Sequence, residues 1–271
     1  MMILTVLLYI LALAPGRLPP KTSSRLWTTA YAHRGLHTKD CRIPENSLAA
    51  FSAAAAAGYG IELDLQLTAD GEVVVFHDDN LLRLCGIDRA VADCTWQELQ
   101  QFNLCESREK IPLFSEVLTL VNGRVPLLVE LKTGSNNKQL CQKTAQLLDN
   151  YQGLFCIESF HPGIVLWFKK NRPQIVRGQL SAGWRRFEML PKLVALLLSS
   201  LLTNIAARPH FVAYHHEDAP HQLKLMLYKL LGGKLLAWTV TAAEQIPDNF
   251  DTFIFEYFLP PRPDYQQGQV S

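Results

Sequence analysis

Short apolar runs, many of them rich in β-branched residues, recur along this chain, and helical patterns separate most of them. Runs of this kind are typical of buried strands. Eight candidates can be placed, at residues 29–32, 61–65, 126–131, 154–159, 175–180, 211–214, 235–240 and 252–256. Strands that alternate with helices form a parallel sheet, and eight such units close into a (β/α)8 barrel. The pattern therefore predicts an α/β fold with a single TIM-type barrel.

The length and charge of the chain narrow its class. A chain of 271 residues is within the usual size of an α/β barrel that forms one domain. We expect an N-terminal apolar anchor and linker at residues 1–25, followed by the barrel at 26–265. The net charge is +1, and no basic stripe with interleaved aromatic residues is present, which argues against a nucleic-acid partner. The sequence indicates no particular oligomeric state.

The second strand candidate continues into a predicted hairpin. It reads Ile-Glu-Leu-Asp-Leu at 61–65, so Glu62 and Asp64 share one face of the strand. The Asp70-Gly71 pair is a strong turn signal, and residues 73–76 return as a β-branched run. This return arm is an extension on strand two and is outside the count of eight. It brings His77 beside the two carboxylates.

Other polar residues also follow the predicted strands. Glu130 and Lys132 have the same i, i+2 spacing as Glu62 and Asp64, so both are expected to point inward. Further polar or aromatic residues at strand ends are His33, Glu158, Gln179, His215, Trp238 and Glu256. The carboxyl ends of the strands form the catalytic face of a (β/α)8 barrel. We therefore expect one active site at that rim.

These residue types are suited to cleavage of a phosphate ester. Glu62, Asp64 and Glu130 offer hard oxygen ligands for one divalent cation, Mg²⁺ or Ca²⁺. Arg34 and Lys132 supply cationic donors for phosphate oxygens. His33 and His77 have side chains that titrate near neutral pH and are predicted to be the general acid and base. Which histidine has which role stays open.

Several motifs occur in an order and spacing that resemble those of glycerophosphodiester phosphodiesterases. They are Ala-His-Arg-Gly at 32–35, Pro-Glu-Asn-Ser-Leu-Ala-Ala-Phe at 44–51, Glu-Leu-Asp at 62–64, Thr-Ala-Asp-Gly at 68–71 and Val-Phe-His-Asp at 75–78. Downstream, Glu-Leu-Lys at 130–132, Ser-Phe at 159–160 and Trp-Thr-Val at 238–240 match later strand ends. The chain departs from the family pattern at Thr241 and at Phe255-Glu256, which affects details of substrate contact.

The resemblance implies metal-dependent hydrolysis of glycerophosphodiesters to sn-glycerol 3-phosphate and an alcohol. Trp238 would pack against the glycerol moiety, unless it is a core residue. A first alternative is a lysophospholipase D-like hydrolase that acts on membrane lysolipids. A second, of another class, is a non-catalytic binding module tethered to the membrane. The attacking group, water or the 2-hydroxyl of the glycerol, and the preferred head group stay open.

Residues 1–14 are apolar apart from Thr5, and cations follow at Arg17, Lys21 and Arg25. The segment is short for a span, and a positive n-region typical of secretory signals is missing. The positive-inside bias favours a membrane anchor that keeps the barrel in the cytosol. A cleaved signal or an extension packed on the barrel are the alternatives. Six scattered cysteines read as free thiols, which agrees with a reducing compartment.

A second apolar segment, residues 193–205, is flanked by cations such as Arg186 and Lys192. It is either an outer barrel helix or an interfacial helix on an anionic leaflet. The histidines at 210, 215, 216 and 221 have irregular spacing, so loop positions are favoured over a metal site.

Overall fold

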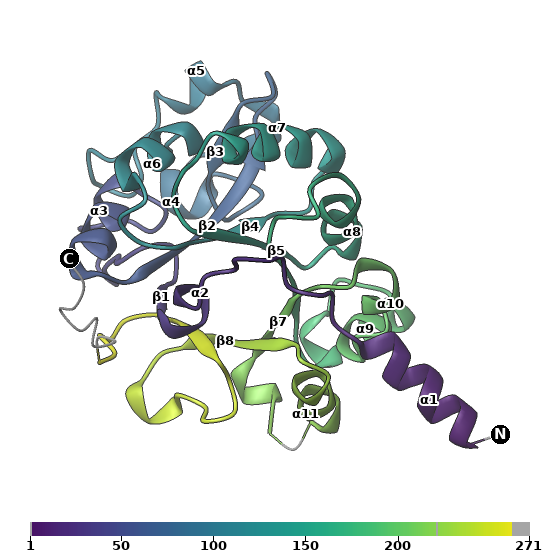
Figure 1. The fold of residues 1–271 in the computed structure, drawn as a ribbon. Helices are drawn as coiled ribbons and strands as arrows, with labels where there is room; N and C mark the ends of the chain where they lie inside the picture. Colours follow the sequence, from purple (N-terminus) through teal and green to yellow (C-terminus); the bar gives the residue numbers. More distant parts are fainter. Residues whose placement is uncertain (1, 221, 262–271) are drawn as a thin grey trace.

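In the computed structural model, which describes residues 2–220 and 222–261, eight parallel strands close into a barrel (Figure 1). They are β1 (Tyr31–Ala32), β2 (Gly60–Leu67), β4 (Leu127–Leu131), β5 (Phe155–Ser159), β6 (Arg177–Ser181), β7 (Phe211–His215), β8 (Lys234–Val240) and β9 (Thr252–Phe255). The short strand β1 pairs with both β9 and β2 and so closes the sheet. The predicted TIM-type barrel is confirmed. The expected end of the barrel at residue 265 lies outside the described residues.

Helices cover the outside of the barrel. They are α3 (Leu48–Ala57), α6 (Phe114–Val121), α7 (Asn137–Asp149), α8 (Pro162–Asn171), α9 (Lys192–Ser199), α10 (Asn204–Ala207) and α11 (Leu223–Leu230). Helix α3 shows how the sequence sets such bounds: the Ser47 hydroxyl accepts from the Ala50 N–H, and Gly58 ends the helix with φ of 80°. Between β8 and β9 the described chain has only the 3₁₀ turn η4 (Ala243–Gln245). Other 3₁₀ turns are η1 (Val91–Asp93), η2 (Trp184–Arg186) and η3 (His216–Asp218).

The barrel interior has an apolar layer toward the amino ends of the strands. The short helix α2 (Arg25–Thr28) places Leu26 and Trp27 against this layer, and the Trp27 ring meets Phe211 edge to face. On β4, Leu128 belongs to the apolar layer, and Glu130 is two residues further along on the same face. The carboxylates of the rim are therefore backed by a dry core.

A small insertion follows β2. Strand β3 (Val73–Val75) pairs antiparallel with the end of β2, with Leu65 opposite Val75. The chain then forms α4 (Leu82–Cys85), η1 and α5 (Trp96–Leu99) around its own apolar cluster, which includes Phe76 and Leu84. This insertion positions the segment that contains His77.

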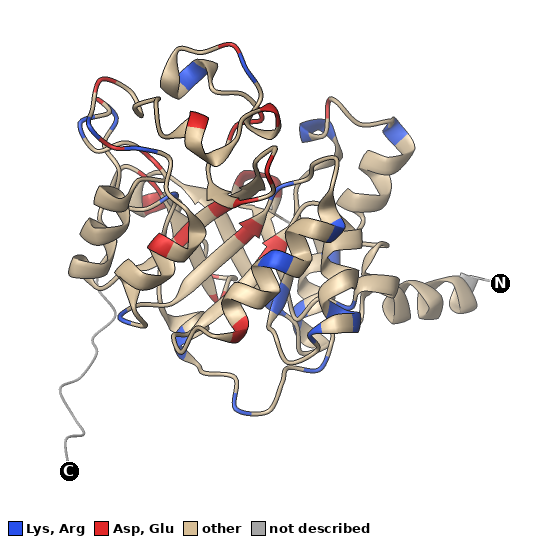
Figure 2. Ribbon diagram, turned by 90° about the horizontal axis from the view of Figure 1, so that it is seen from above, with Lys and Arg blue, Asp and Glu red and all other residues tan. Residues whose placement is uncertain are grey.

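Helix α1 (Met2–Leu13) packs on the barrel through its last turns only. Leu13 is fully buried among residues of α11, β7 and β8. The Tyr9 hydroxyl donates to the Ser200 carbonyl (3.0 Å), and Arg208 Nη1 donates to the carbonyls of Leu11 (2.6 Å) and Ala14 (2.8 Å). The first half of α1 projects away from the barrel (Figure 1 and Figure 2). Among the helices of the described residues, none has both the length and the apolar character needed to cross a bilayer.

His210 precedes β7 and gives a testable pH dependence. Burial, and to a smaller extent Arg177, lower the pKa of this buried histidine to about 3. Its Nδ1 accepts from the Arg177 N–H at 3.2 Å. In the unfolded chain the pKa of this histidine is near 6.5, so falling pH protonates His210 in the unfolded state before it does so in the native state. The stabilising contribution of neutral His210 is therefore complete above about pH 6.5 and is lost as the pH falls toward 3.

We predict that His210→Asn, whose amide oxygen can accept the same bond, flattens this dependence. Between about pH 7 and pH 5 the wild type should lose about 1 to 2 kcal/mol more unfolding free energy than the variant. Urea unfolding at the two pH values measures the difference. Equal losses in both proteins would contradict the prediction.

Candidate active site

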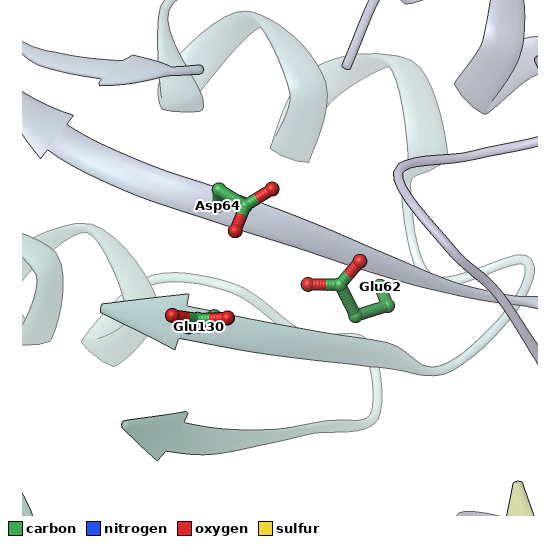
Figure 3. A group of neighbouring side chains, drawn as sticks. All are labelled: Glu62, Asp64 and Glu130. Carbon is green, nitrogen blue, oxygen red and sulfur yellow. The ribbon is translucent and has the colours of Figure 1, made fainter. Parts of the chain in front are cut away.

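Three buried carboxylates converge at the carboxyl-end rim of the barrel. Glu62 and Asp64 lie on β2 and Glu130 lies on β4, where it is the register partner of Asp64. Each of the three offers an oxygen within 4.8 Å of the others. Figure 3 shows the three side chains turned toward one shared space. The predicted inward-facing spacing on both strands brings these residues together.

Burial and mutual repulsion destabilise the ionised carboxylates of this cluster. Burial and repulsion from Asp64 and Glu130 raise the pKa of Glu62 well above its usual value, and burial also raises the pKa of Glu130. Burial acts in the same direction on Asp64, but Lys132 and Arg34 outweigh it and hold its pKa low. A dry set of three hard oxygens with unbalanced negative charge fits a divalent cation such as Mg²⁺ or Ca²⁺. The residues present therefore fit the expected metal.

Arg34 and Lys132, the basic residues predicted to bind phosphate, lie against these carboxylates. Lys132 Nζ is 3.1 Å from Glu130 Oε1 and 3.6 Å from Asp64 Oδ1. Arg34 Nε is 3.5 Å from Asp64 Oδ2, and the Arg34 N–H donates to Glu62 Oε2 at 2.9 Å. Arg34 adopts a left-handed backbone, with φ of 53°.

His33 lies just after β1 and contacts Glu256, a residue at a predicted strand end where the chain departs from the family pattern. Its Nδ1 is 3.3 Å from Glu256 Oε1, which also lies 2.9 Å from His37 Nε2. Burial would raise the pKa of Glu256, but the two histidines hold it well below its usual range. Burial lowers the pKa of His33, and Glu256 offsets this only in part. Burial thus favours the neutral form of His33, and its Nδ1 faces the carboxylate.

His77 lies after β3 and has an equivalent partner. Its Nδ1 is 2.7 Å from Asp78 Oδ1, and Asp78 accepts from Arg83 Nε at 2.6 Å. Arg83 also bonds both oxygens of Glu45, and Glu45 accepts from Arg34 Nη1 at 2.6 Å. Burial lowers the pKa of His77, while the charge of Asp64 acts in the opposite direction. A continuous network therefore joins this histidine to the carboxylate cluster.

The sequence profile of the glycerophosphoryl diester phosphodiesterase family matches residues 33–249, which contain most of this rim. The chain belongs to this family. A glycerophosphodiester phosphodiesterase of Bacillus altitudinis is 32% identical over 160 residues, which cover 55% of this chain and 64% of the relative. Human lysophospholipase D GDPD1 is 30% identical over 156 residues, which cover 53% of this chain and 48% of the relative. Both matches thus span less than two thirds of the relative.

Solved structures share the fold. An Oleispira antarctica phosphodiesterase in complex with the product sn-glycerol-3-phosphate superposes with a TM-score of 0.69 at 23% identity, over 84% of this chain and 92% of that one. A glycerophosphodiester phosphodiesterase from Thermotoga maritima gives a TM-score of 0.64 at 22% identity, over 84% of this chain and 94% of that one. At these identities the likeness supports the barrel of this family member and its connectivity.

Trp238 lies on β8 at the same rim. Its ring meets Phe160 and His215 edge to face, with centroids 5.5 and 4.8 Å away. It thus forms a side wall with residues from the ends of β5 and β7. The departure at Thr241 lies in the turn that follows, where the Thr241 hydroxyl donates to Gln245 Oε1 at 3.0 Å. Thr241 therefore organises the start of η4 in this glycerophosphoryl diester phosphodiesterase family member.

Four residues of the rim were given no role from the sequence. Glu256 and Asp78 each contact a histidine, and Asn46 Nδ2 donates to Asp64 Oδ2 at 2.9 Å. Glu158 is buried beside Glu130, and neither of its carboxylate oxygens has a hydrogen-bond partner within the described part of the chain. Burial, then the charges of Glu130 and Asp64, raise the pKa of Glu158 well above its usual value. A carboxylate inside an apolar strand was the available sequence signal for Glu158.

The other histidines within residues 2–220 and 222–261 do not form a metal-ligand cluster. His210 and His215 lie at opposite ends of β7, and His216 stacks on His215 with ring centroids 5.5 Å apart. His221 lies outside the described residues. Among the residues that are described, the cluster of Glu62, Asp64 and Glu130 is the one with metal-ligand geometry.

Proposed function

We propose that this chain hydrolyses glycerophosphodiesters to sn-glycerol 3-phosphate and an alcohol, with one divalent cation as cofactor. The observation that carries the proposal is the convergence of three buried carboxylates at the barrel rim of a family member. Both histidines are close enough for the charge of Asp64 to raise their pKa values. Glu62, Asp64 and Glu130 would hold Mg²⁺ or Ca²⁺, which polarises phosphoryl oxygens when bound. Arg34 and Lys132 donate hydrogen bonds to the phosphate oxygens and stabilise the negative charge that develops on them in the transition state.

His33 and His77 move the protons. One neutral imidazole accepts the proton of the attacking hydroxyl, and the other donates a proton to the leaving alkoxide oxygen. Both pKa values are lowered in the free protein, and a bound phosphate anion raises that of the donor. Asp78 accepts from Nδ1–H of His77 and fixes the tautomer of that ring, which leaves Nε2 for the substrate. Glu256, 3.3 Å from Nδ1 of His33, favours a proton on that nitrogen. Trp238 packs against the glycerol carbons.

The test uses purified protein that has been stripped with EDTA. Release of sn-glycerol 3-phosphate and choline from glycerophosphocholine is followed before and after Mg²⁺ or Ca²⁺ is restored. We expect turnover only with a restored cation. Substrate binding without turnover under all these conditions would instead support a non-catalytic binding module and contradict the proposal.

Glu256 gives a prediction for a residue that positions His33. We expect Glu256→Gln to lower kcat by roughly tenfold to a hundredfold with little change in KM, as for loss of an orienting partner. Because the carboxylate raises the pKa of His33, its loss should also move the acidic limb of the pH profile to lower pH. Steady-state kinetics across pH measures both effects. The exposed Glu244→Gln is the control, and an unchanged pH profile in Glu256→Gln would remove this role.

We also propose that the protein works at a membrane surface, with the barrel in the cytosol. In support, Ile3, Leu4 and Leu7 on the projecting half of α1 are each more than half exposed, and so is Leu193 on α9. Arg185 and Lys192, the first residue of α9, lie over the Trp184 ring of η2, so cations border this apolar surface. Such a combination favours interfacial binding to anionic lipids. All six cysteines are free, which suits a reducing compartment.

Flotation with vesicles tests the membrane proposal. The wild type should float with anionic vesicles, and Leu4→Asp/Leu7→Asp should reduce partitioning by about tenfold or more, since burial of each leucine is worth about 1.5 to 3 kcal/mol. Leu82→Asp is the matched control, because Leu82 is similarly exposed but lies on α4. Equal flotation of both variants, or a wild type that stays in solution, would contradict the proposal.

A further inference from the structure

A large apolar cavity adjoins the candidate active site. It has a volume of about 630 Å³, within the ~300–1,000 Å³ typical of small-molecule sites. Its apolar lining includes Phe160, Phe187, Leu190, Val194, Leu197 and Trp238. A lining of this kind favours a flexible hydrocarbon over a polar head group.

The cavity borders the rim that carries the chemistry. Thr133 lines it and directly follows Lys132, whose Nζ lies 3.1 Å from Glu130. Phe160 and Trp238, which form the aromatic wall of the candidate active site, also line it. A substrate whose phosphate lies at the carboxylate cluster can therefore extend an apolar substituent past Trp238 and under α9.

Helix α9 separates this cavity from an apolar outer surface. Val194 and Leu197 line the cavity and are still 40% and 38% exposed, so its mouth opens beside them. On the same helix, Leu193 and Leu196 are exposed and do not line the cavity. Helix α1 lies nearby, since Tyr9 bonds the Ser200 carbonyl just after α9 (Figure 1). The opening thus faces the surface that we propose to contact lipid.

We propose that this cavity is an acyl-chain site and that the substrates include 1-acyl lysophospholipids. The inference rests on the proposed function and names its substrate class. An acyl ester on the 1-hydroxyl of the glycerol leaves the phosphodiester unchanged. Water adds to phosphorus, the bond from phosphorus to the head-group oxygen breaks, and that oxygen takes the proton. The products are 1-acylglycerol 3-phosphate and the head-group alcohol.

The first experiment measures turnover. Choline release is compared for glycerophosphocholine and for 1-hexanoyl and 1-decanoyl lysophosphatidylcholine, all as monomers in solution with Mg²⁺ or Ca²⁺. We expect kcat/KM to rise with chain length by about tenfold or more, since burial of about two methylene groups suffices for that factor. Turnover of glycerophosphocholine without any gain from the acyl chain overturns the acyl-chain site but leaves the proposed function. No turnover of any substrate overturns the proposed function.

The second experiment tests the cavity without chemistry. Binding of 1-decanoylglycerol, which has no phosphodiester, is measured by calorimetry in the wild type, in Val194→Asp/Leu197→Asp and in the matched control Leu193→Asp/Leu196→Asp. We expect binding to be lost only in the cavity variant. Leu190→Trp narrows the cavity from a partly exposed position and should also weaken binding if the double variant fails to fold. Equal binding by all variants, no binding by the wild type, or a dimer that covers Val194 and Leu197 overturns the proposal.

Discussion

Alanine at His33 or His77 is expected to lower kcat by about 10² to 10⁴, the usual range for a lost general acid or base. His77 contacts Asp78 at 2.7 Å, His33 lies 3.3 Å from Glu256, and the charge of Asp64 acts on both rings. The fold should survive, because both side chains lie at the rim and are outside the apolar clusters. The rate of choline release from saturating glycerophosphocholine measures kcat, and circular dichroism checks the fold.

His216→Ala is the matched control for the two histidine variants. His216 is a partly buried rim histidine that stacks on His215 and is not part of the carboxylate cluster. The control should keep wild-type turnover. Burial lowers the pKa of both proposed acid–base histidines, so the wild type should retain activity as the pH falls through the usual value of about 6.5. Near-normal turnover in either alanine variant would exclude that histidine from the mechanism.

Loss of one carboxylate of the cluster should lower activity about as much as loss of a histidine does. The same loss should raise the stability of the metal-free protein. Glu62→Gln is expected to lower kcat/KM by about 10³ or more, because an incomplete oxygen set holds the cation poorly. In the absence of metal the same change should raise the unfolding temperature, since Asp64 and Glu130 repel the buried Glu62 carboxylate. Thermal unfolding with EDTA and with added Ca²⁺ measures both states.

In the wild type, the added cation should raise the unfolding temperature, because it binds the native state only. Glu62→Gln should lose this response. Glu158→Gln is the control: this buried side chain lies on β5 beside Glu130 and outside the three-oxygen cluster. It should keep the metal response. A Glu62→Gln variant that responds to metal like the wild type would contradict the assignment of the site.

The parts of the structure that could be predicted from sequence follow from local patterns. The period of two on β2 and β4 places Glu62, Asp64 and Glu130 on the inner face, and the Asp70-Gly71 turn brings the chain back along β2. The contact of Glu256 with His33 could not be foreseen, because it depends on closure of the barrel through the pairing of β1 with β9. The left-handed backbone of Arg34 and Asn46 carries no strong sequence signal either.

The packing of the N-terminal segment could not be predicted from local sequence patterns either. An apolar stretch alone does not distinguish a membrane anchor from a packed helix. Leu13 is buried and Arg208 bonds the end of α1 only because α10, α11 and β7 come together there. Long-range packing, which the sequence does not report, divides this helix into a structural half and an exposed half.

Calorimetric titration of Ca²⁺ or Mg²⁺ into EDTA-stripped protein tests the central claim most directly, because it counts ions without any assay of activity. The claim is that Glu62, Asp64 and Glu130 together form one divalent-cation site that glycerophosphodiester hydrolysis requires. We predict one ion per chain for the wild type, no binding for Glu130→Gln, and recovery of turnover in step with occupancy. Full turnover by stripped protein that binds no ion would contradict the account.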